Sequence, residues 1–542
     1  MQVAKQQRQK LSRFGTSQDG TMTVFALMLF FLMVMMGGLA VDLMRYESTR
    51  TTLQNTLDRA TLAAASLTQE LDGEDVVNDY FAKAGMTEYL RGVTVSEGLN
   101  FREVEADARA ATNPFFIHMI GIDELDALGH STAEQRISNV EIMLVLDVSG
   151  SMLSNSRITN LKTAAKDFVD SVMLNDAENR ISVGIVPFNG QVNLGATLRS
   201  KFNATDNPGL ANANCFDLAS GVYNSSNISR TDSMSMTANA DTYSGTSQVT
   251  SYVNFTDTDS GRPNAGNVWC PPKAGNEITM PLQDTGKLRL AIDALDPIGA
   301  TSINAGIKWG LALMDPSASG IYNDYMAAGT MPSTLENRPF AYTDDEAMKV
   351  IVLMTDGEHF AEERVQSGFK SGLSPIYRSA VDGNYSIFHS TYAGTSKYWV
   401  PHLGTWRSVP WSNSSNTGVV AQQSWPQVWA AMRQSYVAWQ FYARALGTTS
   451  STRNTTYSNQ MSAFRSQTPT ATMDGQLQNI CGQAKSKGVI VYGIAFEAPS
   501  NGQTQIKNCS SSAGHYYNAS GLQIKTAFKS IANNISQLRL TQ

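Results

Sequence analysis

Three short segments of this sequence carry hydroxyl and carboxylate side chains that could surround one metal ion. The segment DVSGS at 147–151 places a carboxylate and two hydroxyls at positions i, i+2 and i+4. Its glycine permits the tight turn that would point these oxygens toward one place. Further oxygen donors occur in GATS at 299–302 and in TDG at 355–357. The predicted metal ligands are Asp147, Ser149, Ser151, Thr301 and Asp356.

All five predicted ligands are hard oxygen donors, with neither sulfur nor imidazole nitrogen among them. Such a set favours a hard divalent cation that keeps several waters, most simply Mg²⁺, with Mn²⁺ and Ca²⁺ as alternatives. The competing interpretation is that these residues only cap helices and turns, where Ser and Asp are common. We favour the metal site because each of the five lies where an element is predicted to begin or end.

Two apolar runs are predicted to bring the carboxylates together. The run at 140–146 ends at Asp147, and the run at 349–354 ends just before Asp356. Runs of this kind are typical of strands buried on both faces of a parallel sheet, and ligands bind beyond the carboxyl ends of such strands. The alternation of strands and helices predicts a doubly wound, mostly parallel α/β domain over residues 140–542. Further strands are predicted at 181–186 and 489–495, and helices at 158–172, 288–295, 302–314, 475–487 and 522–538.

Two stretches interrupt this alternation and are predicted to be insertions into the α/β domain. Residues 200–277 are rich in small polar side chains, whereas residues 358–473 hold most of the tryptophans. A helix predicted near 426–446 carries an aromatic stripe. This stripe either packs the core of the insertion or borders the metal and selects a partner, and both interpretations stay open. The stripe consists of Val428, Trp429, Met432, Tyr436, Trp439 and Tyr442.

The N-terminus is predicted to anchor the chain in a membrane. Residues 20–41 carry no charge and are long enough to cross a bilayer as a helix. Residues 1–19 carry four basic side chains and one acidic one, which predicts a cytoplasmic N-terminal tail and translocation of everything after Asp42. A signal peptide cleaved near Gly38-Leu39-Ala40 is the alternative. We favour the uncleaved anchor because the apolar run exceeds a usual signal-peptide core.

The helical pattern continues beyond the predicted membrane segment. It predicts an amphipathic, pilin-like stalk helix over 42–72 that ends near Leu71-Asp72-Gly73. Residues 73–139 form a small mixed segment to which the sequence assigns no fold. The apolar positions predicted for the buried face of the stalk are Met44, Leu53, Leu57, Ala60, Ala64 and Leu67.

The four cysteines are widely spaced, which argues against a structural zinc site and favours disulfides in an oxidising compartment. Three pairings are possible, of which we predict the sequential one, Cys215–Cys270 and Cys481–Cys509. The net charge of -6 shows no basic surface, so nucleic acid is not an expected partner. Charged residues make up only 16% of the chain, which fits an extracytoplasmic surface.

Catalysis is not expected from this set of residues. Ser149 lacks the G-x-S-x-G context of a hydrolase nucleophile. His359 is the only candidate base near Asp356, and a lone histidine at such a place is more often a structural loop residue. We therefore predict a binding protein and not an enzyme.

The five predicted ligands resemble, in order and context, the DxSxS…T…D metal-ion-dependent adhesion site of von Willebrand factor A (VWA) domains. The apolar strands before DVSGSM and in VLMTDG strengthen the resemblance. It implies that the serines and the threonine approach the metal while the aspartates hold its waters. It also implies that an Asp or Glu carboxylate of a partner protein completes the coordination.

Both ends of the chain resemble the TadE/TadG-like proteins of Flp (tight-adherence) pilus assembly. The segments GLAVDL at 38–43, LQNTLDRA at 53–60 and KGV at 487–489 carry this resemblance, together with Cys509 and the LRL segment at 538–540. It implies a single-pass protein of the bacterial inner membrane whose bulk lies in the periplasm, with pilus or pilus-assembly proteins as partners. One departure is Phe25, which stands where pilin-type subunits carry glutamate.

The function predicted from these features is metal-dependent protein binding in Flp/Tad-type pilus assembly or surface adhesion. The first alternative is a structural, pseudopilin-like subunit without metal-dependent binding. The second is a metal-assisted hydrolase.

Overall fold

The structure is a computed structural model of the 542-residue chain. The chain divides into two units, residues 1–137 with 539–542, and residues 138–538. The predicted cytoplasmic tail and Leu67 lie outside the described residues. The structure describes residues 20–66, 69, 71–97, 101–136, 139–174, 176, 179–206, 213–238, 240, 241, 268–344 and 347–541.

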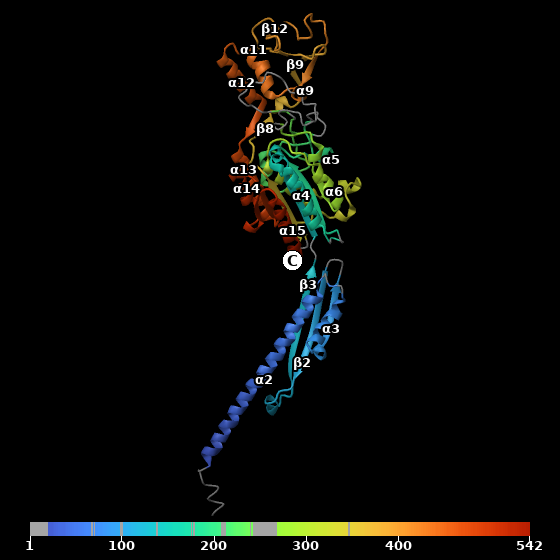
Figure 1. The fold of residues 1–542 in the computed structure, drawn as a ribbon, viewed down its shortest axis with the longest axis vertical. Helices are drawn as coiled ribbons and strands as arrows, with labels where there is room; N and C mark the ends of the chain where they lie inside the picture. The colour runs from blue at the N-terminus through green and yellow to red at the C-terminus, as the bar shows by residue number, and fades with distance from the viewer. Residues whose placement is uncertain are drawn as a thin grey trace, which may run out of the picture. The chain divides into compact units, whose positions relative to one another are not determined.

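The first unit is built on one long helix, α2 (Thr21–Ala64). Its N-terminal part is apolar and exposed on all sides, and it is long and apolar enough to cross a membrane. Buried positions begin at Gly38 and then recur along one face at spacings close to three, four and seven. The helix therefore has two parts, an apolar part before Gly38 that no other part of the unit covers and a later part that packs on the rest of the unit (Figure 1).

Two details of the predicted stalk are wrong. The helix ends at Ala64 and not near 72. Asp72 instead begins a second helix, α3 (Gly73–Lys83), because its carboxylate accepts the Glu74 N–H and caps the first turn. Met44 is 74% exposed, whereas the polar Asp42 is buried on the packed face. Hydrophobic periodicity could not identify Asp42, because its burial depends on hydrogen bonds with a distant loop.

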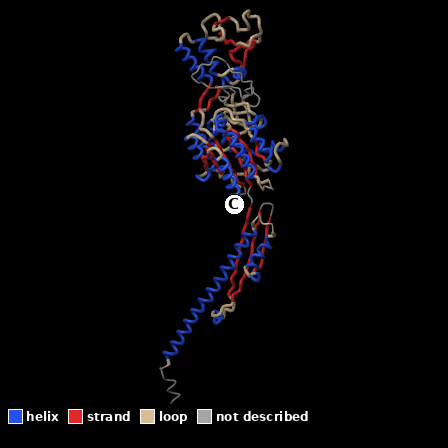
Figure 2. The backbone as a smooth tube through the Cα atoms, viewed as in Figure 1, coloured by secondary structure: helices blue, strands red, loops and turns tan. Residues whose placement is uncertain are grey.

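A three-stranded antiparallel sheet completes the first unit, with β1 (Leu90–Glu97), β2 (Phe101–Thr112) and β3 (Leu125–Arg136) in this order. Figure 2 shows these strands beside α2. The face toward the helix is lined largely by alanines, so the helix can approach closely. At Gly129 a Cβ atom would lie 2.6 Å from Leu57 Cδ1, so any larger residue there would displace the Leu57 side chain.

The second unit is centred on a six-stranded sheet in the order β16-β15-β7-β4-β5-β6. The chain starts in the middle with β4, runs outward through β5 and β6, and then fills the other side with β7, β15 and β16. Five strands are parallel, and the edge strand β6 is antiparallel to β5. The bounds are β4 (Asn139–Asp147), β5 (Ile181–Phe188), β6 (Thr279–Leu282), β7 (Ala347–Thr355), β15 (Ile490–Phe496) and β16 (Tyr516–Ala519).

Helices cover both faces of this sheet (Figure 1). Alternate residues of β4 serve the two faces, since Leu144 packs with one set of helices and Met143 with the other. The first face is covered by α4 (Arg157–Val172), α6 (Thr285–Ala294) and α15 (Gln523–Thr541). The other is covered by α7 (Ile303–Met314), α13 (Thr470–Ser486) and α14 (Ser500–Cys509). The predicted mixed α/β architecture with an N-terminal apolar helix is confirmed.

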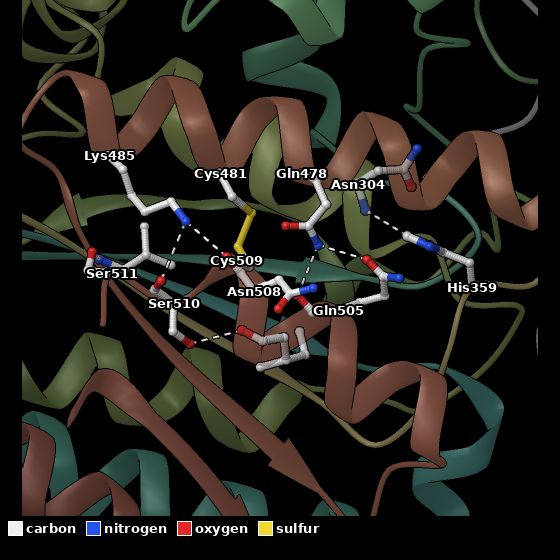
Figure 3. Close-up of a disulfide and its surroundings, with 12 residues drawn as sticks. Asn304, His359, Gln478, Cys481, Lys485, Gln505, Asn508, Cys509, Ser510 and Ser511 are labelled. Carbon is white, nitrogen blue, oxygen red and sulfur yellow. Dashed lines mark hydrogen bonds between the residues drawn. A yellow bond between two sulfur atoms is a disulfide. The ribbon is translucent and has the colours of Figure 1, made fainter. Parts of the chain in front are cut away.

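The edge strands β6 and β16 were not predicted, because each has only four residues and neither forms a long apolar run. Both predicted disulfides are present. Cys215–Cys270 lies within the polar insertion, and Cys481–Cys509 joins α13 to α14. Figure 3 shows the second one, beside which Lys485 Nζ donates to the Asn508 carbonyl at 2.9 Å.

The tryptophan-rich insertion leaves the α/β sheet on a two-stranded stem, β8 (Glu362–Val365) paired with β14 (Arg465–Thr468). Its strands form an antiparallel sheet in the order β12-β11-β10-β9-β13. The bounds of these strands are β9 (Leu373–Ser379), β10 (Tyr385–Phe388), β11 (Tyr398–Val400), β12 (Thr405–Arg407) and β13 (Val420–Ser424). Helix α12 (Ser450–Phe464) leads into β14.

The helix predicted near 426–446 is broken into α9 (Trp425–Ala431), α10 (Gln434–Val437), a π-turn (Ala438–Ala443) and α11 (Arg444–Leu446). The break occurs where Met432 is extended and the Gln434 N–H donates to the Asp241 carbonyl of the polar insertion. Most of the predicted stripe is buried within a hydrophobic cluster of the insertion.

Trp429 is the central residue of this cluster. Its ring packs on Trp425 and Phe464, and its Nε1 donates to the Phe369 carbonyl at 2.7 Å. We expect Trp429→Ala to destabilise the insertion by about 3–5 kcal/mol, because it removes a buried aromatic side chain and leaves a cavity. Limited proteolysis should then cut within 358–473 before the rest of the domain. Val419→Ala, at an exposed position, is the control, and equal cutting rates in both variants would contradict the assignment.

Candidate metal centre

The site is built at the carboxyl ends of the two central strands. Asp147 is the last residue of β4, and its carboxylate is fully buried. Oδ1 accepts from the Ser149 N–H at 2.7 Å, and Oδ2 accepts from the Thr355 hydroxyl at 2.6 Å. Thr355 ends β7, the parallel neighbour of β4. These bonds hold the carboxylate at the switch point of the sheet, where β5 lies on one side of β4 and β7 on the other. Ligands usually bind at this position in such folds.

Hydroxyls connect the first loop to the second carboxylate. Ser149 Oγ lies 2.9 Å from Ser151 Oγ, and the Ser151 hydroxyl donates to Asp356 Oδ1 at 2.6 Å. Asp147, Ser149, Ser151 and Asp356 therefore form a continuous chain of polar contacts. Residues 147 and 356 are far apart in sequence, so the pairing of β4 with β7 is what brings them together.

The third loop carries Thr301, immediately before α7. A Cβ atom built on Gly357 would lie 3.6 Å from Thr301 Oγ1, so this hydroxyl lies beside the loop that carries Asp356. A backbone hydrogen bond joins this third loop to the 147–151 loop, since the Gly150 N–H donates to the Gly299 carbonyl at 2.9 Å. Gly299 has a φ of 89°, which side chains other than glycine rarely adopt. The structure thus brings all five predicted residues into one region.

The two carboxylates have different electrostatic surroundings. Burial, followed by the charge of nearby Asp356, raises the pKa of Asp147 above its ordinary value. Asp356 is paired with a cation, since Arg157 Nη1 donates to its Oδ2 at 2.7 Å. The same guanidinium donates to Glu497, and the Gly521 N–H and Arg157 together lower the Glu497 pKa. Asp147 is held by neutral donors and is the carboxylate that gains most from a bound cation.

A surface pocket of about 430 Å³ opens at these loops. Its lining includes Ser151, Thr301 and Asp356, whereas Asp147 and Ser149 are buried and not among the lining residues. A mixed set of buried carboxylate oxygens and accessible hydroxyls fits a hard divalent cation that keeps part of its water shell. The residues present are therefore compatible with Mg²⁺, Mn²⁺ or Ca²⁺.

His359 also lines the pocket, but both of its ring nitrogens are engaged. Nε2 accepts from the Asn304 N–H at 3.2 Å, so Nδ1 carries the proton and donates to Asp474 at 2.7 Å. Figure 3 shows the ring directed at Asn304. The histidine joins the start of the insertion to α7 and α13, which is a structural role.

Sequence reasoning missed three residues that hold this site, namely Thr355, Arg157 and Glu497. Thr355 directly precedes the predicted ligand Asp356, and its position at the end of a buried strand was an available signal. Arg157 and Glu497 had no such signal, because α4 and the end of β15 approach Asp356 only in the folded sheet.

The aromatic stripe does not line this pocket. Among the described lining residues, Phe360 is half exposed and packs beside Trp269. The interpretation that the stripe packs the core of the insertion is therefore the better one.

Comparison with known proteins gives one sequence family. Residues 20–67 match the family model of TadE/G-like Flp pilus-assembly proteins. This match covers the whole of α2 and leaves the α/β unit outside it. No curated protein matches the chain.

Several solved structures are distantly similar. The vWF domain of the type V pili tip protein Mfa5 from Porphyromonas gingivalis has 12% identity and a TM-score of 0.31, over 74% of this chain and 96% of that one. The pilus adhesin SpaC from Lactobacillus rhamnosus GG has 13% identity and a TM-score of 0.27, over 83% and 34%. The PilB minor pilin from Streptococcus sanguinis has 13% identity and a TM-score of 0.27, over 83% and 78%.

The raised pKa of Asp147 predicts a pH-dependent response to metal. Between about pH 4 and the raised native pKa, the metal-free native state holds a proton that the unfolded chain has released. The stability of the metal-free protein should therefore fall as the pH rises through this window. A divalent cation binds the ionised carboxylate, so the rise in Tm on adding Mg²⁺ should be larger at about pH 8 than at about pH 6.

Asp147→Asn is the decisive variant for this prediction. It should weaken Mg²⁺ binding by about 10–100-fold in calorimetry and abolish the pH dependence of the Mg²⁺-induced rise in Tm. Asp167→Asn, at an exposed position on α4, is the matched control and should behave as wild type. Equal Mg²⁺ binding by the Asp147 variant and wild type would contradict the assignment.

Proposed function

We propose that this chain is a membrane-anchored binding protein of Flp/Tad-type pilus assembly or surface adhesion, and that its α/β unit is a VWA-type domain. In this proposal the domain captures a partner through a divalent cation held by Asp147, Ser149, Ser151, Thr301 and Asp356. The observation that carries the proposal is the continuous polar chain from Asp147 to Asp356 at the carboxyl edge of the sheet.

The membrane and pilus parts of the proposal rest on the N-terminal helix. The apolar part of α2 is exposed on all sides, as expected for a segment surrounded by lipid. The match of residues 20–67 to a pilus-assembly family supports the same setting. The excess of basic residues before position 20 favours a cytoplasmic N-terminus, which would place the α/β unit in the periplasm of a bacterium.

The proposed site has only two carboxylates among its five ligands, so a bound divalent cation would keep part of its positive charge. A divalent cation bound here would be a Lewis acid with a coordination position open to a carboxylate of the partner. The residues of this chain hold the site ready for it. Ser151 and Thr301 present hydroxyls to the pocket, while Thr355 fixes one oxygen of Asp147 and Arg157 one oxygen of Asp356. Because Arg157 neutralises part of the local charge, an incoming acidic side chain meets less repulsion.

The two alternatives are less well supported. A metal-assisted hydrolase could not use His359 as its general base, because both ring nitrogens of this histidine are engaged. In a purely structural subunit, the buried carboxylate of Asp147 would have no role. An ionised carboxylate among neutral donors lowers the stability of the fold unless a cation compensates its charge. We therefore retain metal-dependent binding.

Capture of partners from native membranes should depend on the metal and on Asp147. Full-length protein should retain its partner in Mg²⁺, lose it in chelator, and regain it when Mg²⁺ is restored. Thr301→Val should weaken capture at least about tenfold by removing one hydroxyl ligand, while Thr301→Ser keeps that oxygen and retains binding. Capture that is unchanged in chelator and in Asp147→Asn would refute the metal-dependent mechanism.

A further inference from the structure

The loop between β2 and β3 is fastened to the middle of α2, where the uncharged segment 20–41 ends. Asp42 lies directly after the uncharged segment 20–41, and its carboxylate accepts three backbone N–H groups of this loop. The donors are Phe115 at 3.0 Å, Phe116 at 2.6 Å and Ile117 at 2.9 Å. A carboxylate with three such partners holds the loop firmly in place.

The loop also packs on the apolar segment itself. A Cβ atom on Gly38 would lie 2.2 Å from Phe116 Cγ, so the ring rests on the bare backbone of the helix. Gly38 and Asp42 are four residues apart and occupy one face of adjacent turns. The loop therefore lies level with the last turn of the proposed membrane span.

The outer side of this loop is apolar and exposed. Phe115 and Met119 are 69% and 71% exposed, and Ile120 and Ile122 are exposed as well. The Arg45 guanidinium lies 4.3 Å from the centre of the Phe115 ring, one turn beyond the apolar segment. The polar side chains His118 and Asp123 of the same loop pair with each other at 2.7 Å.

We propose that the β2–β3 loop is a second membrane contact, which inserts Phe115, Met119, Ile120 and Ile122 into the lipid interface beside the end of the transmembrane helix. The inference rests on the proposed membrane anchor. Residues 20–41 as a helix span roughly 33 Å, close to the hydrocarbon thickness of a bilayer, so Gly38 and Asp42 fall at its boundary. Apolar side chains at this depth are in lipid, whereas Arg45, His118 and Asp123 reach the headgroups.

Continuity with the anchor favours lipid over a protein partner as the occupant. The helix and the loop are joined by direct contacts, so any bilayer that surrounds residues 20–41 must also meet the loop. The contact would restrain the tilt and rotation of the helix, because two points and not one are fixed at the interface.

Spin labels at introduced cysteines test this contact in full-length protein reconstituted into phosphatidylcholine vesicles. All four native cysteines are in disulfides, so only the introduced thiol is labelled. The test site is Met119→Cys. Val34→Cys reports on the span, and Leu62→Cys lies on α2 roughly 30 Å beyond Asp42 as the aqueous control. Collisions with oxygen report lipid exposure, and collisions with a water-soluble nickel chelate report water exposure.

We expect the label at 119 to favour oxygen, as at 34, and the label at 62 to favour the nickel chelate. A label at 119 that resembles the one at 62, while 34 remains in lipid, overturns the loop contact and leaves the anchor intact. A label at 119 shielded from both reagents also overturns it, because the loop is then covered by protein. A label at 34 exposed to water refutes the anchor, and with it this inference.

Asp42→Ala, combined with Met119→Cys, tests whether Asp42 positions the loop. Removing the carboxylate leaves three N–H groups without their acceptor, so the label at 119 should become more mobile and less exposed to oxygen. The label at 62 in the same background should keep its spectrum if the helix remains packed on the sheet. An unchanged signal at 119 would show that Asp42 does not position the loop.

Discussion

The α/β unit of this molecule is organised around one costly arrangement, a carboxylate buried at the carboxyl end of a central strand. Asp147 lies at the end of β4, beside the end of β7, and is held by a backbone N–H and a hydroxyl. Burial and a second carboxylate raise its pKa, so the ionised form needs a cation. The loops that surround it are shaped accordingly, with glycines where backbones meet and hydroxyls where the pocket opens.

Asp42 uses the same physical device for a different purpose. Both aspartates are buried, and both organise chain that is distant in sequence by accepting hydrogen bonds. Asp42 is satisfied by three N–H groups of one loop, which fixes the geometry of the first unit. Asp147 is paired with neutral donors beside another acid, which leaves a deficit of positive charge. The difference in surroundings separates a structural carboxylate from a candidate ligand.

The tryptophan-rich insertion leaves the six-stranded sheet of the α/β unit intact. The tryptophan-rich insertion leaves and returns on the paired strands β8 and β14, and its aromatic side chains form their own cluster. His359, at the base of this insertion, is tied to α7 and α13. These bonds fasten the start of the insertion beside the pocket, and the neighbouring Phe360 lines the pocket as well.

The sequence by itself determined the features that are written in continuous short segments. These are the apolar segment 20–41, the buried strands, and the DVSGS and TDG loops at the ends of two of them. Long apolar runs have few alternatives to a buried strand, so β4, β5, β7 and β15 were predicted within two residues of their observed ends. Only the tertiary structure decided the rest. Arg157 pairs with both Asp356 and Glu497, and the β2–β3 loop meets Gly38 and Asp42, through contacts between segments far apart in the chain. Local periodicity contains no information about such contacts, because their energy depends on which surfaces the fold brings together.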